Sequence, residues 1–152
     1  TMTELVLPTH TNALDTVFGG TVMSWIDICA AIAAQRHAGR DVVTASMDRL
    51  SFVAPIRRGW VVNLKASVNF TSRTSMEVGV RVDAENPTTG EKVHSATAYV
   101  TFVSLDANGK PQSVAPIQPE TESEKRRYQA AIRRRASRVT LANELKNEKL
   151  KS

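Results

Sequence analysis

One carboxylate lies within an otherwise apolar stretch of the sequence. The segment FGGTVMSWIDICAAIAA, residues 18 to 34, has Asp27 as its one charged residue. Burying an unpaired charge is costly, so such a residue either performs chemistry or is satisfied by hydrogen bonds at a subunit contact. A carboxylate that is partly withdrawn from water is also a stronger base than an exposed one. Asp27 is therefore a candidate general base or nucleophile, and a hydrogen-bonded structural Asp is the alternative.

Two glycines lie at the start of the same segment, just before a helix expected from Thr21 to about Gly39. Backbone N–H groups at a helix start have no intrahelical acceptor, and they favour a negative charge in front of them. Without a β-carbon the backbone can also come close to a substrate carbonyl. Gly20 is a candidate oxyanion donor and Gly19 a substrate contact, whereas a turn that needs glycine for its backbone shape is the alternative.

The elements that must position these residues follow from hydrophobic periodicity. Val22, Ile26, Cys29 and Ala33 recur at helical spacing, and the other faces of this helix are also largely apolar, so other structure must enclose it. A short extended run at 4–8 precedes the helix, and four segments with strand character follow at 41–54, 60–72, 75–86 and 94–106. The order β-α-β-β-β-β predicts an α+β fold in which an antiparallel sheet wraps around one long central α-helix.

Composition restricts the other classes of function. The 152 residues suit a single compact domain, and no apolar run approaches the ~20 residues that cross a bilayer. With no basic, apolar leader at its start, the chain is expected to be cytoplasmic and not to bind a membrane. The lone Cys29 excludes an intrachain disulfide, and His10, His37 and His94 lack metal-binding spacing, so we expect no metal and no cofactor.

The net charge of +5 is confined to the end of the chain. Residues 1–119 hold ten Lys/Arg and ten Asp/Glu, whereas residues 120–152 hold ten and five. We divide the chain into a domain at 1–118 and a basic C-terminal tail at 119–152, which is expected to be a solvated or weakly packed helix. An arm that binds nucleic acid is unlikely, because runs of charge are usually solvated faces.

Ten short fragments in order along the chain resemble the acyl-CoA thioesterases of the hotdog fold, the group with the bacterial YciA-type enzymes and the brain-type acyl-CoA hydrolases. The similarity covers roughly residues 5 to 116. One departure is Asp15, where these proteins often have Gly. The fragments are Thr11-Asn12-Ala13, Phe18-Gly19-Gly20, Met23-Ser24-Trp25-Ile26-Asp27, Arg36-His37, Val42-Val43-Thr44-Ala45-Ser46, Phe52, Pro55-Ile56, Ser72-Arg73-Thr74-Ser75-Met76-Glu77, Thr101-Phe102-Val103 and Gly109-Lys110-Pro111.

The resemblance implies dimers that join edge to edge, active sites at the dimer interface, and further assembly, commonly as a hexamer formed by a trimer of dimers. It matches Asp27 to the catalytic carboxylate and Asn12 to a second catalytic position that faces the carboxylate of the other protomer. An Asx-turn is the commoner use of an Asn in such a loop. Thr44 is a lesser candidate for a hydrogen bond to the carboxylate, and an ordinary strand residue is equally plausible.

The activity that these residues predict is hydrolysis of an acyl-CoA thioester to a free fatty acid and coenzyme A. A base, oxyanion donors and a water aimed at the carbonyl are its requirements. The phosphates of coenzyme A, which is present as part of substrate and product, need basic or polar partners. A non-catalytic acyl-CoA sensor is the alternative, and a hotdog hydratase is a weaker one. The candidate phosphate and substrate contacts are Arg57, Arg58, Arg73, Thr74 and Ser75.

Overall fold

The computed structural model describes residues 1–151 and contains one antiparallel sheet of five strands. The strand order is β1-β3-β4-β5-β2, with consecutive strands β3, β4 and β5 at the centre and β1 and β2 at the edges. The predicted α+β order is confirmed, and a single-turn 3-10 helix at Pro8–His10 adds to it. The strands are β1 (Met2–Leu5), β2 (Val42–Phe52), β3 (Val61–Thr71), β4 (Ser75–Glu85) and β5 (Lys92–Ser104).

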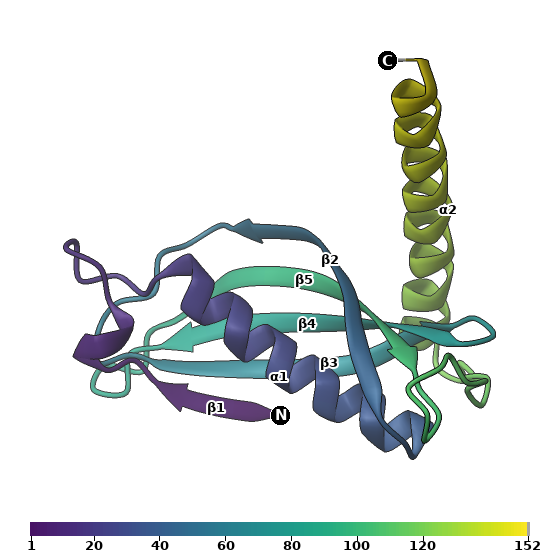
Figure 1. The fold of residues 1–152 in the computed structure, drawn as a ribbon. Helices are drawn as coiled ribbons and strands as arrows, with labels where there is room; N and C mark the ends of the chain where they lie inside the picture. The colour runs from purple at the N-terminus through teal and green to yellow at the C-terminus, as the bar shows by residue number, and fades with distance from the viewer. Residues whose placement is uncertain (152) are drawn as a thin grey trace.

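The long helix α1 (Gly19–Ala38) crosses the concave face of the sheet (Figure 1). Its fully buried residues pack against the apolar side chains of the central strands, and they are Val22, Ile26, Ala30 and Ala34. The helix ends at Gly39, whose φ of 67° is a left-handed conformation that glycine adopts without strain. The sheet side of this core is formed by Val62, Leu64, Val78, Val80, Val82, Ala96, Ala98 and Val100.

The opposite side of α1 is open in the single chain. Met23 is 43% exposed and Ile28 is 49% exposed, although both belong to a helix that is apolar on most faces. The sheet therefore encloses only part of the surface of α1 that the sequence predicts to be buried. Exposed apolar surface of this kind is typical of a protein contact.

A β-bulge interrupts β3 near its end. Val68 pairs with Val78, but Phe70 pairs with Glu77, so the strict alternation ends at this point. The alternation of apolar residues in the sequence, at Val62, Leu64, Ala66, Val68 and Phe70, predicts that Phe70 shares the apolar face with Val68, and this prediction is wrong. The extra residue of a bulge shifts the following side chain to the other face. The Phe70 ring makes an edge contact at 5.2 Å with Tyr128 of the C-terminal helix instead.

The C-terminal helix α2 (Glu122–Lys151) begins with a reciprocal capping box. The Thr121 hydroxyl accepts a hydrogen bond from Glu124 N at 3.1 Å, and the Glu124 carboxylate accepts one from Thr121 N at 3.1 Å. From this start the helix rises away from the outer face of the sheet, and the C-terminus lies at its far end (Figure 1).

The first half of α2 is packed more firmly than the sequence predicts. Ala131 is fully buried, and Arg134 donates hydrogen bonds to both carboxylate oxygens of Glu77, at 2.6 and 3.1 Å. The guanidinium carbon of Arg134 also lies 3.6 Å from the centre of the Tyr99 ring. The expectation of a weakly packed tail is wrong for this half of the helix, whereas residues 139–151 are all exposed.

Within residues 1–151, no helix has both the length and the apolar character needed to cross a membrane.

Candidate active site

Asp27 lies in the middle of α1 and faces the edge strand β2. The Thr44 hydroxyl donates a hydrogen bond of 2.7 Å to Asp27 Oδ1, so the expected contact between these residues is present. Asp27 is half-buried, and its Oδ2 has no hydrogen-bond partner among the described residues. The carboxylate is thus held at one oxygen, and the other is available to a water or a substrate.

An irregularity of β2 follows Thr44 directly. Thr44 pairs with Phe102 and Ser46 with the adjacent Thr101, so Ala45 is an extra residue in the strand. A bulge bends its strand and changes the direction of neighbouring side chains.

Gly19 and Gly20 are the first two residues of α1, and no side chain caps this end of the helix. Their backbone N–H groups therefore face outward without an intrahelical acceptor. A β-carbon at Gly20 would meet no atom within 4 Å, so nothing inside the chain requires glycine there. At Gly19 a β-carbon would lie 3.4 Å from the Phe52 ring. Nothing in the local sequence indicates that Phe52 lies beside this end of the helix.

Asn12 organises the loop that precedes α1. Its Oδ1 accepts hydrogen bonds from Leu14 N at 2.9 Å and from the backbone and hydroxyl of Thr16 at 3.3 and 3.2 Å. The Asx-turn alternative is therefore realised within one chain. Its Nδ2 has no partner in the described part of the chain, so the amide still has two hydrogens to donate.

The segment with Arg57 and Arg58 lies beside the Asn12 loop. Thr16 forms an isolated β-bridge with Arg57, and Arg58 N donates to Asp15 O at 3.1 Å. Both arginines are thus brought to the end of the molecule where α1 begins.

Asp15 has a backbone φ of 57°, a conformation that glycine adopts more easily. Its carboxylate lies 3.3 Å from Arg58 Nη2, in an exposed ion pair. The extra acidic side chain is therefore directed to Arg58 and reduces the positive charge that Arg58 offers to a phosphate.

Arg73 and Thr74 lie at the opposite end of the sheet, in the β3–β4 turn, and Ser75 is the first residue of β4. The backbone of this turn binds the C-terminal segment of the domain, since Arg73 O accepts from Val114 N at 3.0 Å. About eleven residues of β3, at roughly 3.3 Å each, separate it from Arg57, so one chain does not bring these arginines together.

The candidate residues thus form separate groups. Asn12, Gly19 and Gly20 surround the start of α1, whereas Asp27 lies seven residues beyond Gly20, roughly 10 Å along the helix axis. No hydrogen bond joins Asn12 to Asp27 in the chain as far as residue 151. A single protomer contains both halves of the expected site but does not assemble them.

The histidines have structural partners. His37 Nε2 lies 2.7 Å from Ala115 O, His10 Nδ1 accepts from Leu7 N at 3.0 Å, and His94 contacts Asp83 and Thr97 on the outer sheet face. Residues 1–151 contain no group of three or more His, Cys, Asp or Glu that could hold a metal ion.

Comparison with known proteins identifies the class of this chain. The thioesterase superfamily model matches residues 14–91, and the chain belongs to this superfamily. An uncharacterized acyl-CoA thioester hydrolase of Bacillus subtilis (strain 168), YkhA, is 45% identical over 97% of this chain and 81% of its own length.

Solved structures agree with this class and with the hotdog architecture. A hexameric acyl-CoA thioesterase superposes with a TM-score of 0.89 at 44% identity, covering 93% of this chain and 90% of the other. An acyl-CoA hydrolase of Staphylococcus aureus, in complex with butyryl coenzyme A, coenzyme A and coenzyme A disulfide, has a TM-score of 0.84 at 38% identity over 96% of this chain and 92% of the other. Variants of that hydrolase with one asparagine, aspartate or threonine replaced by alanine have also been solved.

Proposed function

We propose that this chain is an acyl-CoA thioesterase, which converts acyl-CoA and water to a fatty acid and coenzyme A. The observation that carries the proposal is the Thr44–Asp27 hydrogen bond, which orients a half-buried carboxylate and leaves its second oxygen without a partner. A carboxylate that is fixed at one oxygen and free at the other can accept a proton from a water or attack a carbonyl at a defined position.

The replaced residues of the Staphylococcus aureus hydrolase support these roles. In this chain Asn12 precedes Asp27 by 15 positions, and Thr44 follows Asp27 by 17. The asparagine, aspartate and threonine that were replaced in the hydrolase follow one another at the same two intervals. The same three residue types at the same spacing favour a shared catalytic constellation.

Two protomers would complete each site. Asn12 and Gly20 lie at the start of α1, too far from Asp27 of the same chain to act with it on one carbonyl. The open side of α1 and the edge strand β2 offer apolar surface for a second copy. We place Asn12 and Gly20 of one protomer opposite Asp27 and Thr44 of the partner subunit, in a dimer that assembles further as a trimer of dimers.

The reaction then assigns one task to each group. Asp27 either removes a proton from the water that attacks the thioester carbon, or attacks that carbon itself to form a mixed anhydride that water then hydrolyses, and Thr44 holds its carboxylate in position. In both routes the C–S bond breaks, and coenzyme A leaves as a thiolate that takes up the proton released by the water. The Gly20 N–H, helped by the positive end of the α1 dipole, donates to the developing oxyanion. The Asn12 amide donates to the carbonyl or to the water.

Arg57 and Arg73 are the better candidates for the phosphates of coenzyme A. Neither has an ion-pair partner within residues 1–151, whereas Arg58 is paired with Asp15. Thr74 and Ser75 directly follow Arg73 in the chain.

The test is release of free thiol from acyl-CoAs with two to eighteen acyl carbons. We expect turnover by the parent protein and a loss of at least a hundredfold in Asp27→Asn, because the amide can neither accept the proton nor attack. Asp41→Asn, at an exposed Asp directly before the strand β2 that bears Thr44, is the matched control and should retain full activity. Tight binding of acyl-CoA without thiol release at any chain length would instead show a sensor.

A further inference from the structure

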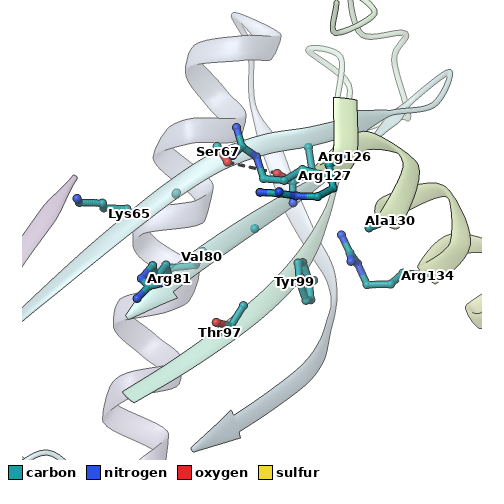
Figure 2. A pocket seen from close by; sticks show the side chains of 13 residues that line it. Lys65, Ser67, Val80, Arg81, Thr97, Tyr99, Arg126, Arg127, Ala130 and Arg134 are labelled. Carbon is teal, nitrogen blue, oxygen red and sulfur yellow. Dashed lines mark hydrogen bonds between the residues drawn. The ribbon is translucent and has the colours of Figure 1, made fainter. Parts of the chain in front are cut away.

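A second concave surface lies on the outer face of the sheet, away from α1. It is the corner between strands β3, β4 and β5 and the first half of α2, and it encloses about 640 Å³ (Figure 2). The sheet separates this groove from the helix that bears Asp27. Its volume lies in the range of small-molecule sites, roughly 300–1,000 Å³.

The lining of the groove is strongly basic. Lys65 and Arg81 line it from the sheet, and Arg126, Arg127 and Arg134 line it from α2. No Asp or Glu is among its lining residues. Like charges that converge in a concave, partly enclosed surface repel one another, and they attract anions more strongly than the same charges on a flat surface.

Part of this charge is already compensated by the protein. Arg134 is paired with the buried Glu77, and Arg81 donates its Nε hydrogen to the Asp83 carboxylate at 3.0 Å. Arg127 donates to the Ser123 hydroxyl at 2.8 Å.

Lys65 and Arg126 have no hydrogen-bond or ion-pair partner in the described chain. Both residues line the groove, Lys65 from β3 and Arg126 from α2, and the Lys65 side chain lies at the edge of the groove farthest from α2 (Figure 2). One cation on the sheet and one on the helix suit a ligand that carries negative charge at two points, because a single anionic group cannot contact both cations.

The sheet surface of the groove also carries hydroxyl groups. Ser67 lies on β3 with Lys65, and Thr97 and Tyr99 lie on β5, two strands away and beyond Arg81 and Gly79. Their hydroxyl groups can bind ribose or phosphate oxygens, and the arginines supply forked donors that match phosphate geometry.

We propose that this outer-face groove binds a phosphorylated small molecule with at least two phosphate groups, held between Lys65 and Arg126. The ligand would be the phosphate end of a free nucleotide or of coenzyme A. The proposal does not depend on the thioesterase function, because the groove shares no residue with the site around Asp27.

The experiment is calorimetric titration of the full chain with inorganic pyrophosphate, ADP and coenzyme A, at matched ionic strength. We expect saturable binding that weakens about tenfold in Arg126→Ala and in Lys65→Ala, the effect of losing one charge-assisted contact. Arg133→Ala removes an exposed arginine of α2 that does not line the groove, and it should bind like the parent. The variants should keep their thiol-release activity.

The three ligands identify the source of the phosphates. Equal affinity for pyrophosphate and ADP would show that the groove recognises the phosphates alone. A higher affinity for coenzyme A than for ADP, lost in Arg126→Ala, would identify coenzyme A as the ligand. The proposal is overturned if none of the ligands binds at millimolar concentration, or if Arg133→Ala weakens binding as much as Arg126→Ala. A change of oligomeric state in Lys65→Ala, without ligand binding by the parent, would also overturn it and show that the groove is a subunit contact.

Discussion

Replacing Arg134 by Met should destabilise the protein more than the same replacement at any exposed arginine of α2. Glu77 is only 1% exposed, and Arg134 donates to both of its oxygens from a side chain that is itself 10% exposed. Removing one partner of a buried ion pair costs about 3–5 kcal/mol, because it leaves an uncompensated charge. Asn69 Nδ2 at 3.3 Å and Arg138 Nη1 at 3.6 Å remain beside Glu77 and reduce the loss. We expect the lower end of the range, about 3 kcal/mol.

The assays are urea unfolding, which gives the free energy of unfolding, and thermal unfolding, both followed by circular dichroism at one fixed protein concentration because assembly also stabilises the folded state. The melting temperature should fall by about 6–12 °C, since 1 kcal/mol corresponds to roughly 2–4 °C for a chain of this length. Arg133→Met is the control. The double variant Glu77→Leu/Arg134→Met should recover most of the loss, because no buried charge remains. A loss below about 1 kcal/mol in Arg134→Met, or additive losses in the double variant, would refute this account of how α2 is held.

Three further predictions concern the site and the outer face. Thr44→Val should lower kcat/KM for acyl-CoA about tenfold, because it removes one charge-assisted hydrogen bond to Asp27, and an unchanged value would exclude this role. Gly20→Ala should reduce thiol release while leaving thermal stability equal or higher, since alanine favours the helix by roughly 0.5–1 kcal/mol and meets no neighbour; full activity would remove Gly20 from the oxyanion site. Burial raises the pKa of Asp83, but hydrogen bonds and charges from Arg81 and His94 outweigh it and hold the pKa below its usual 3.8. The ionised Asp83 carboxylate should therefore stabilise the folded protein fully above about pH 5, and this stabilisation should disappear as the pH falls below 4. The parent should be more stable than Asp83→Asn at neutral pH, and this difference should vanish in acid.

The sequence predicts the layers of the fold well because their signal is local. Alternation of Val62 and Leu64 with polar neighbours defines a half-buried strand wherever the partner strand lies. The helical spacing of Val22 and Ile26, closed by Gly39, defines α1 in the same way. These patterns depend on one segment at a time, so they do not need the tertiary structure.

Features that depend on contacts between distant segments were not predicted. The ion pair of Arg134 with Glu77 joins residues 57 positions apart, and each looks like a surface charge in its own segment. The bulge that moves Phe70 to the outer face arises from pairing with β4, although its neighbours alternate regularly. The contact of Phe52 with Gly19 likewise joins two elements whose local patterns are unrelated.

For the candidate site, the residue types could be proposed from the sequence but not their division between protomers. Asp27 is conspicuous because its neighbours are apolar, and its hydrogen bond to Thr44 is present in one chain. Asn12 is committed to its own loop through Oδ1, and nothing in the local sequence shows which carboxylate its amide would face.

The sharing of each site between two protomers is tested most directly by mixing two inactive variants. Asn12→Ala and Asp27→Asn chains, unfolded together in equal amounts and refolded, should form mixed dimers in which one site has both native residues. Half of the dimers are then mixed and each has one intact site of two, so the account predicts about one quarter of the parent thiol-release activity. Activity no higher than that of the separate variants, with exchange of protomers verified, would contradict a site built from two chains.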